Sequence, residues 1–147
     1  PEREIIVKLH PTGNVSFDIK PLIKKIDPSI KIFQSENILD LLEESDVLIS
    51  LNYSTVILDA ITLQKPTLAL LPEEQNYEDE IMLKDGAALF TTDINEIGKK
   101  MKVLFDDEKI RDELISKGNK FADKWAKSNS LARAMYRESG VDVYMYD

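Results

Sequence analysis

A chain of 147 residues with 43% hydrophobic content is large enough to form one globular domain with its own core. Its net charge of -8 argues against nucleic acid or an anionic membrane surface as the main partner. The absence of cysteine excludes disulfides and thiolate metal ligands, and the single histidine, His10, excludes a metal site built on several histidines.

The longest apolar runs fall far short of the roughly 20 residues that span a bilayer, so the sequence predicts no transmembrane segment. With no cysteine and no leader pattern, a cytoplasmic location in a reducing compartment is expected. The chain starts at Pro1 and reaches a predicted strand almost at once, which favours a piece cut from a longer protein.

Five short apolar segments predict β-strands. They are continuously apolar rather than alternating, which is typical of strands buried on both faces of a parallel sheet. In chain order they are Glu4 to Leu9, Ile30 to Phe33, Val47 to Leu51, Thr67 to Leu71 and Ala88 to Thr91.

Helical periodicity fills the segments between these strands. The expected helices are Phe17 to Ile26, Ile38 to Glu44, Ser54 to Gln64, Glu78 to Lys84 and Ile94 to Phe105, with a long helical tail from Glu108. Asp27-Pro28 and Lys65-Pro66 are expected to end helices, and Asp93 or Thr92 to cap the helix near Ile94. Gly118 interrupts the tail pattern at a cost of about 1 kcal/mol.

The alternation of strands and helices predicts an α/β fold, a Rossmann-like doubly wound parallel sheet of about five strands with a helical C-terminal tail. Residues 1–147 are expected to form this single domain. Ligands of such sheets bind outside the carboxyl ends of the strands. Three polar segments follow predicted strands there: His10, the turn from Asn52 to Thr55, and the loop from Glu73 to Tyr77.

The turn after the third predicted strand is the strongest functional lead. A helix start presents unsatisfied N–H groups and partial positive charge, so Ser54 and Thr55 are suited to an anion such as a nucleotide diphosphate. Asp59 lies about 7 Å further along the helix and could accept from two ribose hydroxyls. The alternative is that Asp59 pairs with Lys65 or another nearby cation, while Ser54 and Thr55 are ordinary caps.

Two further polar residues are candidates at the same edge. His10, held extended before Pro11, could donate to a phosphate or transfer a proton, although a loop histidine bonded to backbone is the commoner case. Gln75 could bond sugar hydroxyls. The acids Glu73, Glu74, Glu78, Asp79 and Glu80 could form an acid/base cluster or a metal site, but a solvated loop and helix start is favoured.

Together these segments resemble a known family. Val7-Lys8-Leu9-His10-Pro11, the run from Asp40 to Ser50, and Tyr53-Ser54-Thr55 followed by Asp59-Ala60 and Lys65-Pro66 resemble the donor-binding C-terminal domain of GT-B fold glycosyltransferases. The likeness extends to enzymes of capsule and teichoic-acid synthesis, including CDP-glycerol glycerophosphotransferases, and more distantly to nucleotide-sugar 2-epimerases and lipid-II-forming N-acetylglucosaminyltransferases. It covers about Ile5 to Phe90.

The resemblance implies a role for each matching residue. The acid that holds the ribose falls on Asp59, and the turn whose backbone N–H groups hold the diphosphate falls on Ser54 and Thr55. Asn52 and Tyr53 just before them are further substrate-binding candidates, the histidine facing the donor phosphate falls on His10, and a donor-sugar contact falls on Gln75. The glycine-rich turn of many members is replaced here by Asn52-Tyr53. No cofactor and no metal is implied, and His10 is the candidate catalytic residue.

The implied activity is transfer of a glycosyl or glycerophosphoryl group from a nucleotide-activated sugar or glycerol donor in surface-polysaccharide synthesis. The resemblance also implies an N-terminal acceptor domain that the sequence does not contain, so the chain alone is expected to be inactive. Two alternatives stay open: a domain of a nucleotide-sugar epimerase or hydrolase, and a non-catalytic α/β interaction module. No nucleic-acid partner is expected.

Overall fold

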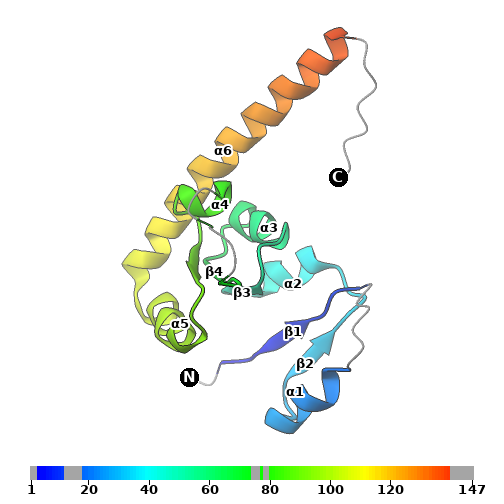
Figure 1. Cartoon of the computed structure of the whole chain (residues 1–147), viewed down its shortest axis with the longest axis vertical. Helices are drawn as coiled ribbons and strands as arrows, with labels where there is room; N and C mark the ends of the chain where they lie inside the picture. Colours follow the sequence, from blue (N-terminus) through cyan, green and yellow to red (C-terminus); the bar gives the residue numbers. More distant parts are fainter. Residues whose placement is uncertain (1–2, 12–17, 74–76, 78–79, 140–147) are drawn as a thin grey trace. The chain divides into compact units, whose positions relative to one another are not determined.

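The structure is a computed structural model of the 147-residue chain, and it describes residues 3–11, 18–73, 77 and 80–139 (Figure 1). The side chains of residue 81 and of residues 129–139 are outside this description. The chain divides into two compact units, Pro1–Leu41 and Leu42–Asp147. The division falls within helix α2 (Ile38–Glu44).

The first unit contains a two-stranded parallel sheet and one helix, with bounds β1 Ile6–Lys8, α1 Lys20–Ile26 and β2 Lys31–Phe33. Val7 lies opposite Ile32, and Lys8 Nζ donates to the carbonyl of Gln34 at 2.7 Å. Helix α1 ends at Asp27, whose carboxylate accepts from the N–H and hydroxyl of Ser29. These bonds lower the pKa of Asp27 and fix the turn into β2.

The second unit contains a three-stranded parallel sheet in the order β3-β4-β5. Ile49 of β3 lies opposite Leu68 of β4, which lies opposite Leu89 of β5. The bounds are β3 Leu48–Leu51, α3 Val56–Thr62, β4 Thr67–Leu70, α4 Ile81–Lys84, β5 Leu89–Thr91, η1 Ile94–Glu96, α5 Ile97–Asp106 and α6 Glu108–Ser139.

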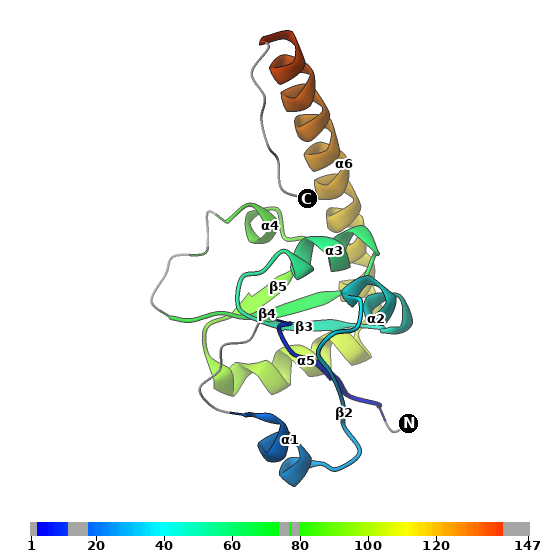
Figure 2. The same cartoon turned by 90° about the vertical axis from the view of Figure 1, so that its right-hand side faces the viewer.

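Strand β4 is buried on both faces, as continuously apolar strands predict. On one face, Leu68 packs with Leu104 of α5 and Leu114 of α6. On the other, Ala69 packs with helices α3 and α4, which lie opposite α5 in Figure 2. Burial of a side chain the size of Leu68 contributes about 1.5–3 kcal/mol, so β4 is the centre of the core.

Helix α6 contributes side chains to the hydrophobic clusters on both faces of the sheet. Leu114 belongs to the cluster on the α5 side, whereas Phe121, two turns later, belongs to the cluster that contains Ile61 of α3. Between them Gly118 approaches α3 so closely that a Cβ there would lie 3.2 Å from Ile61 Cγ2. The glycine that interrupts the predicted helix pattern is therefore a packing position.

Parallel strands, intervening helices and a helical C-terminal end confirm the predicted Rossmann-like α/β class. The described strands pair in two sheets of two and three strands, whereas the sequence predicts one sheet of about five. The helix predicted from Ser54 is shorter, because the chain leaves α3 through a turn in which Gln64 has a φ of 58° and Lys65 N–H donates to Ala60 C=O. The helix predicted from Ile94 begins with the 3₁₀ turn η1.

Candidate functional site at the turn between β3 and α3

A hydrogen bond from the buried Ser50 hydroxyl holds the backbone of this turn. Asn52 N–H donates to Leu70 C=O at 3.0 Å and so continues the ladder with β4. Ser50, which is buried, donates through its hydroxyl to Asn52 C=O at 2.9 Å. Asn52 has a φ of 123°, a conformation that favours glycine. Since C=O and N–H of one trans peptide point in opposite directions, the N–H of Tyr53 is directed away from Ser50.

Three consecutive backbone donors lie in this turn without an acceptor among the described residues. In the described part of the chain, no hydrogen bond is found for the N–H groups of Tyr53, Ser54 and Thr55. Thr55 is the N-cap residue of α3 but forms no side-chain cap, and Ser54 Oγ accepts from Val56 N–H only at 3.4 Å. The two hydroxyl residues are therefore poor caps, and the N–H groups are available to an anion.

Asp59 lies one helical turn beyond Thr55, since its N–H donates to Thr55 C=O at 3.2 Å. Its side chain is half-buried, and burial raises the pKa of its carboxyl group. No ion pair of Asp59 occurs among the described residues, and Lys65 Nζ instead donates to Glu43 C=O at 2.9 Å. The Asp59–Lys65 pairing considered from the sequence is thus not formed.

Tyr53 turns its ring toward the protein interior and anchors the turn. The ring packs against the cluster that contains Ile57 and Met82. Burial raises the pKa of the Tyr53 hydroxyl, and the negative charge of Glu80 raises it further. Because the ring packs against this cluster, the backbone N–H is the group of Tyr53 that we consider for a ligand.

The other predicted site residues lie in the first unit or outside the described residues. His10 is an exposed residue beyond β1 in the first unit, and its carbonyl accepts from Gln34 Nε2 at 3.5 Å. Gln75 lies outside the described residues, as do Glu74, Glu78 and Asp79 of the acidic segment. Within the described ranges, no group of three His, Asp or Glu side chains is arranged to hold a metal ion.

Ser50 is a site residue that sequence reasoning missed. The available signal was the single hydroxyl residue, Ser50, in the otherwise apolar strand Val47-Leu48-Ile49-Ser50-Leu51. In the structure this strand is followed directly by Asn52, which has a positive φ. A buried hydroxyl needs a partner, and the nearest carbonyl of the turn supplies it.

The fold and the turn define a Rossmann-like α/β protein whose third strand leads into an uncapped, anion-compatible helix start. The family described as CDP-Glycerol:Poly(glycerophosphate) glycerophosphotransferase matches residues 1–130, and the chain belongs to that family. None of the curated proteins compared with the chain matches it. The expected relation to transferases of teichoic-acid type is confirmed at this level. No helix in the described ranges is long and apolar enough to cross a membrane.

Proposed function

We propose that the chain is the donor-binding domain of a glycerophosphotransferase of surface-polysaccharide synthesis, and that its donor is CDP-glycerol. The family match over residues 1–130 is the observation that carries this proposal, because the family description names this donor and a glycerophosphate polymer as acceptor. Within the proposal, residues 1–147 form one domain, the donor half of a GT-B-like enzyme, and the reacting end of the acceptor is held by another part of that enzyme.

The N–H groups of Tyr53, Ser54 and Thr55 are assigned to the diphosphate of the donor. They have no acceptor in the described chain, and the positive end of α3 adds to their attraction for an anion. Asp59 is assigned to the ribose hydroxyls. This assignment is supported by the absence of an ion pair of Asp59 among the described residues, since a half-buried carboxylate without one needs hydrogen-bond donors.

The chemistry follows from the donor and acceptor. A hydroxyl oxygen of the polymer forms a bond to the phosphorus that carries the glycerol, the bond from that phosphorus to the bridging oxygen breaks, and CMP leaves with this oxygen. The hydroxyl proton passes to a base outside the residues assigned here. The turn would stabilise the negative charge that develops on the leaving phosphate, and His10 is assigned a donor role toward the same phosphate.

Titration with CDP, followed by backbone amide NMR, tests the proposal. We expect shifts at Tyr53, Ser54, Thr55 and Asp59, and weaker effects with UDP if the cytosine base is read. Inorganic pyrophosphate should shift the three turn amides and leave Asp59 unchanged, because it has no ribose. An interaction module without nucleotide affinity predicts no change with any of these compounds, and that result would overturn the proposal.

A further inference from the structure

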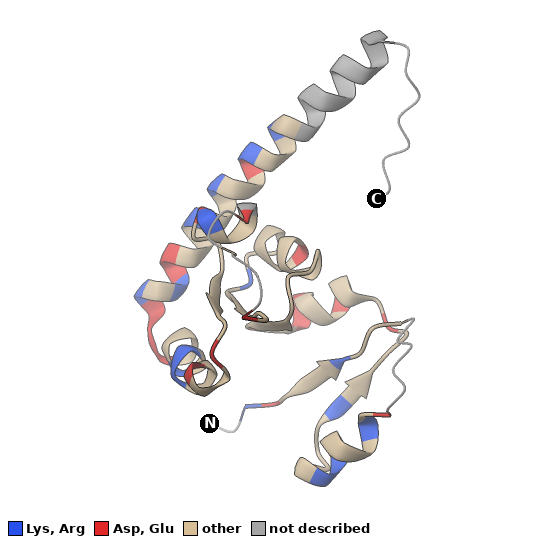
Figure 3. Ribbon diagram, viewed as in Figure 1, with Lys and Arg blue, Asp and Glu red and all other residues tan. Residues whose placement is uncertain are grey.

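A face of α6 that the proposed donor site does not use carries four lysines. Lys117, Lys120, Lys124 and Lys127 follow one another at spacings of three, four and three residues, which places them along one side of a helix. All four are exposed. We call this set the lysine face. Figure 3 shows basic positions recurring along α6.

The packing of α6 fixes the direction of this face. Leu114, Gly118 and Phe121 are buried against the second unit, so the lysine face does not lie against the core. It extends about 15 Å along the helix axis from Lys117 to Lys127. Gly118 contacts Ile61 at the C-terminal end of α3, whereas the proposed donor turn precedes the N-terminal end of α3. The two places are therefore distinct.

The charge on this stretch is opposite to that of the whole chain. Residues 114–128 contain four lysines against one acid, Asp123, a net charge of +3 in a chain with a net charge of -8. Lys124 Nζ lies 3.6 Å from Asp85. In the described ranges no ion pair is found for Lys117 or Lys120. By contrast, Lys100 and Lys102 of α5 pair with Glu96 and Asp106.

Interaction with the C-terminal end of the helix dipole does not account for the lysine face. Cations stabilise a helix within its last turn, and Lys127 is 12 residues before the last residue of α6, Ser139. Neighbouring lysines three or four residues apart repel one another. A row of like charges on a rigid helix is favourable when an anion with repeated charges lies along it.

We propose that the lysine face binds a linear phosphodiester chain, and that this chain is the glycerophosphate polymer of the family description. Such a polymer carries one negative charge for each glycerol unit, so successive phosphates can contact successive lysines. The choice of polymer rests on the proposed function. The lysine face would hold the polymer at a place separate from the donor turn and keep it near the enzyme between transfers.

The test compares two double variants with the same change in charge. Lys117→Gln/Lys120→Gln alters the lysine face, and Lys99→Gln/Lys102→Gln alters α5. We expect a poly(glycerophosphate) oligomer to bind the unchanged chain with an affinity that falls with salt. The first variant should bind it roughly tenfold more weakly, with the slope of log K against log salt reduced by about 1.4, and the α5 variant should bind as before.

Three outcomes contradict the proposal: no binding of the oligomer, equal loss in both variants, or equally tight binding of an oligothymidylate or of phosphatidylglycerol vesicles. Circular dichroism of each variant checks that the helix content is unchanged. CDP titration of the same variants separates this inference from the proposed function. If CDP still shifts the amides of the turn while the oligomer does not bind, only the lysine face is refuted.

Discussion

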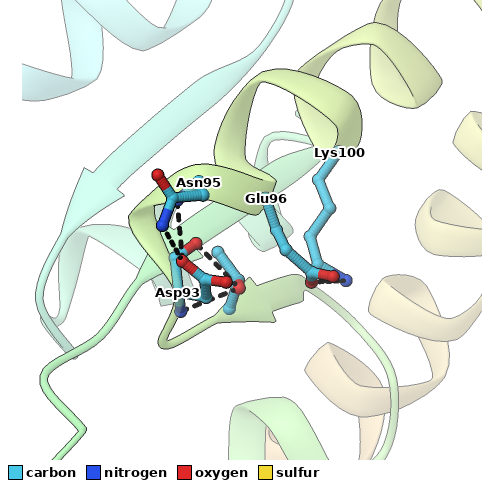
Figure 4. Close-up of polar contacts among 5 residues, drawn as sticks. Asp93, Asn95, Glu96 and Lys100 are labelled. Atoms are coloured by element: carbon cyan, nitrogen blue, oxygen red, sulfur yellow. Dashed lines mark hydrogen bonds and ion pairs between the residues drawn. The ribbon is translucent and has the colours of Figure 1, made fainter.

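Two turns in the second unit follow parallel strands and lead into helices, yet they differ in the hydrogen bonds that their backbone N–H groups form. After β5, the Asp93 carboxylate accepts from the N–H of Asn95 at 2.8 Å and from its side chain at 2.9 Å (Figure 4). After β3, Thr55 makes no cap and three N–H groups have no acceptor in the described chain. The hydrogen bonds of the first turn are made within the chain, whereas the second turn has N–H groups that we propose bind the donor.

The difference also appears in the backbone. Asp93 N–H donates to Thr91 Oγ1 and no residue of that turn has a positive φ. At the other turn, Asn52 has a φ of 123° and its carbonyl is held by Ser50. Strain of this kind persists where the surrounding structure enforces it, and it is common at binding sites. The comparison therefore separates a structural turn from a candidate functional one.

The largest effect is expected for Asp59→Asn on CDP affinity. A carboxylate that accepts from hydroxyls contributes about 1.5–3 kcal/mol, so CDP should bind roughly tenfold or more weakly. Calorimetric titration measures this. Affinity for inorganic pyrophosphate should stay the same, and Asp112→Asn, an exposed acid of α6, is the matched control. Unchanged CDP affinity in Asp59→Asn would contradict the assignment of Asp59 to the ribose hydroxyls.

Asn52→Val tests whether the strained backbone of the β3 turn is needed. A β-branched residue is disfavoured at a φ of 123°, so we expect a loss of about 1–3 kcal/mol in the free energy of unfolding, measured in urea, together with weaker CDP binding. Asn52→Gly adopts this conformation without strain and should keep both stability and binding. Equal loss in the two variants would show that the asparagine side chain, not the backbone, matters.

Asp93→Ala removes the side-chain cap of the turn after β5. Loss of the cap should cost about 1 kcal/mol of stability in the same urea measurement. CDP affinity should be unaffected, because this turn is not assigned to the donor. The corresponding change at the other turn, Thr55→Ala, should cost little stability, since Thr55 makes no side-chain cap bond. A larger loss for Thr55→Ala than for Asp93→Ala would reverse the comparison.

The smallest effect concerns pH. Burial raises the pKa of Asp59 above its ordinary value of 3.8, so between these two values the folded chain binds more protons than the unfolded chain. The contribution of Asp59 to stability therefore falls as pH rises through this window. Relative to the wild type, Asp59→Asn should become more stable as pH rises through this window. Urea unfolding at several pH values measures the trend.

Asp27 gives the opposite sign and serves as the control. Its bonds from Ser29 lower its pKa, so its contribution is present above the ordinary value and is lost as pH falls through the lowered one. Asp27→Asn should thus be less stable than the wild type at neutral pH. The same direction of change in both variants would contradict the assigned causes.

Much of the fold was predictable because its signals are local. The strand Thr67 to Leu71 and the helix Ile38 to Glu44 match β4 and α2 closely, since apolar runs and flanking prolines act within a few residues. The cap at Asp93 follows equally from sequence, because an aspartate can reach only the N–H groups just after it. The position of the β3 turn was predicted for the same reason.

By itself, the sequence determined the α/β class, the order of its elements and the place of the turn, because these depend on periodicity and neighbouring residues. Only the tertiary structure decided that Ser50 holds the Asn52 carbonyl, that Tyr53 packs against the cluster containing Met82, that Asp59 forms no ion pair among the described residues, and that Gly118 contacts α3. Each depends on groups brought together by folding, and the 3.6-residue and 2-residue periods of a sequence carry no information about such contacts.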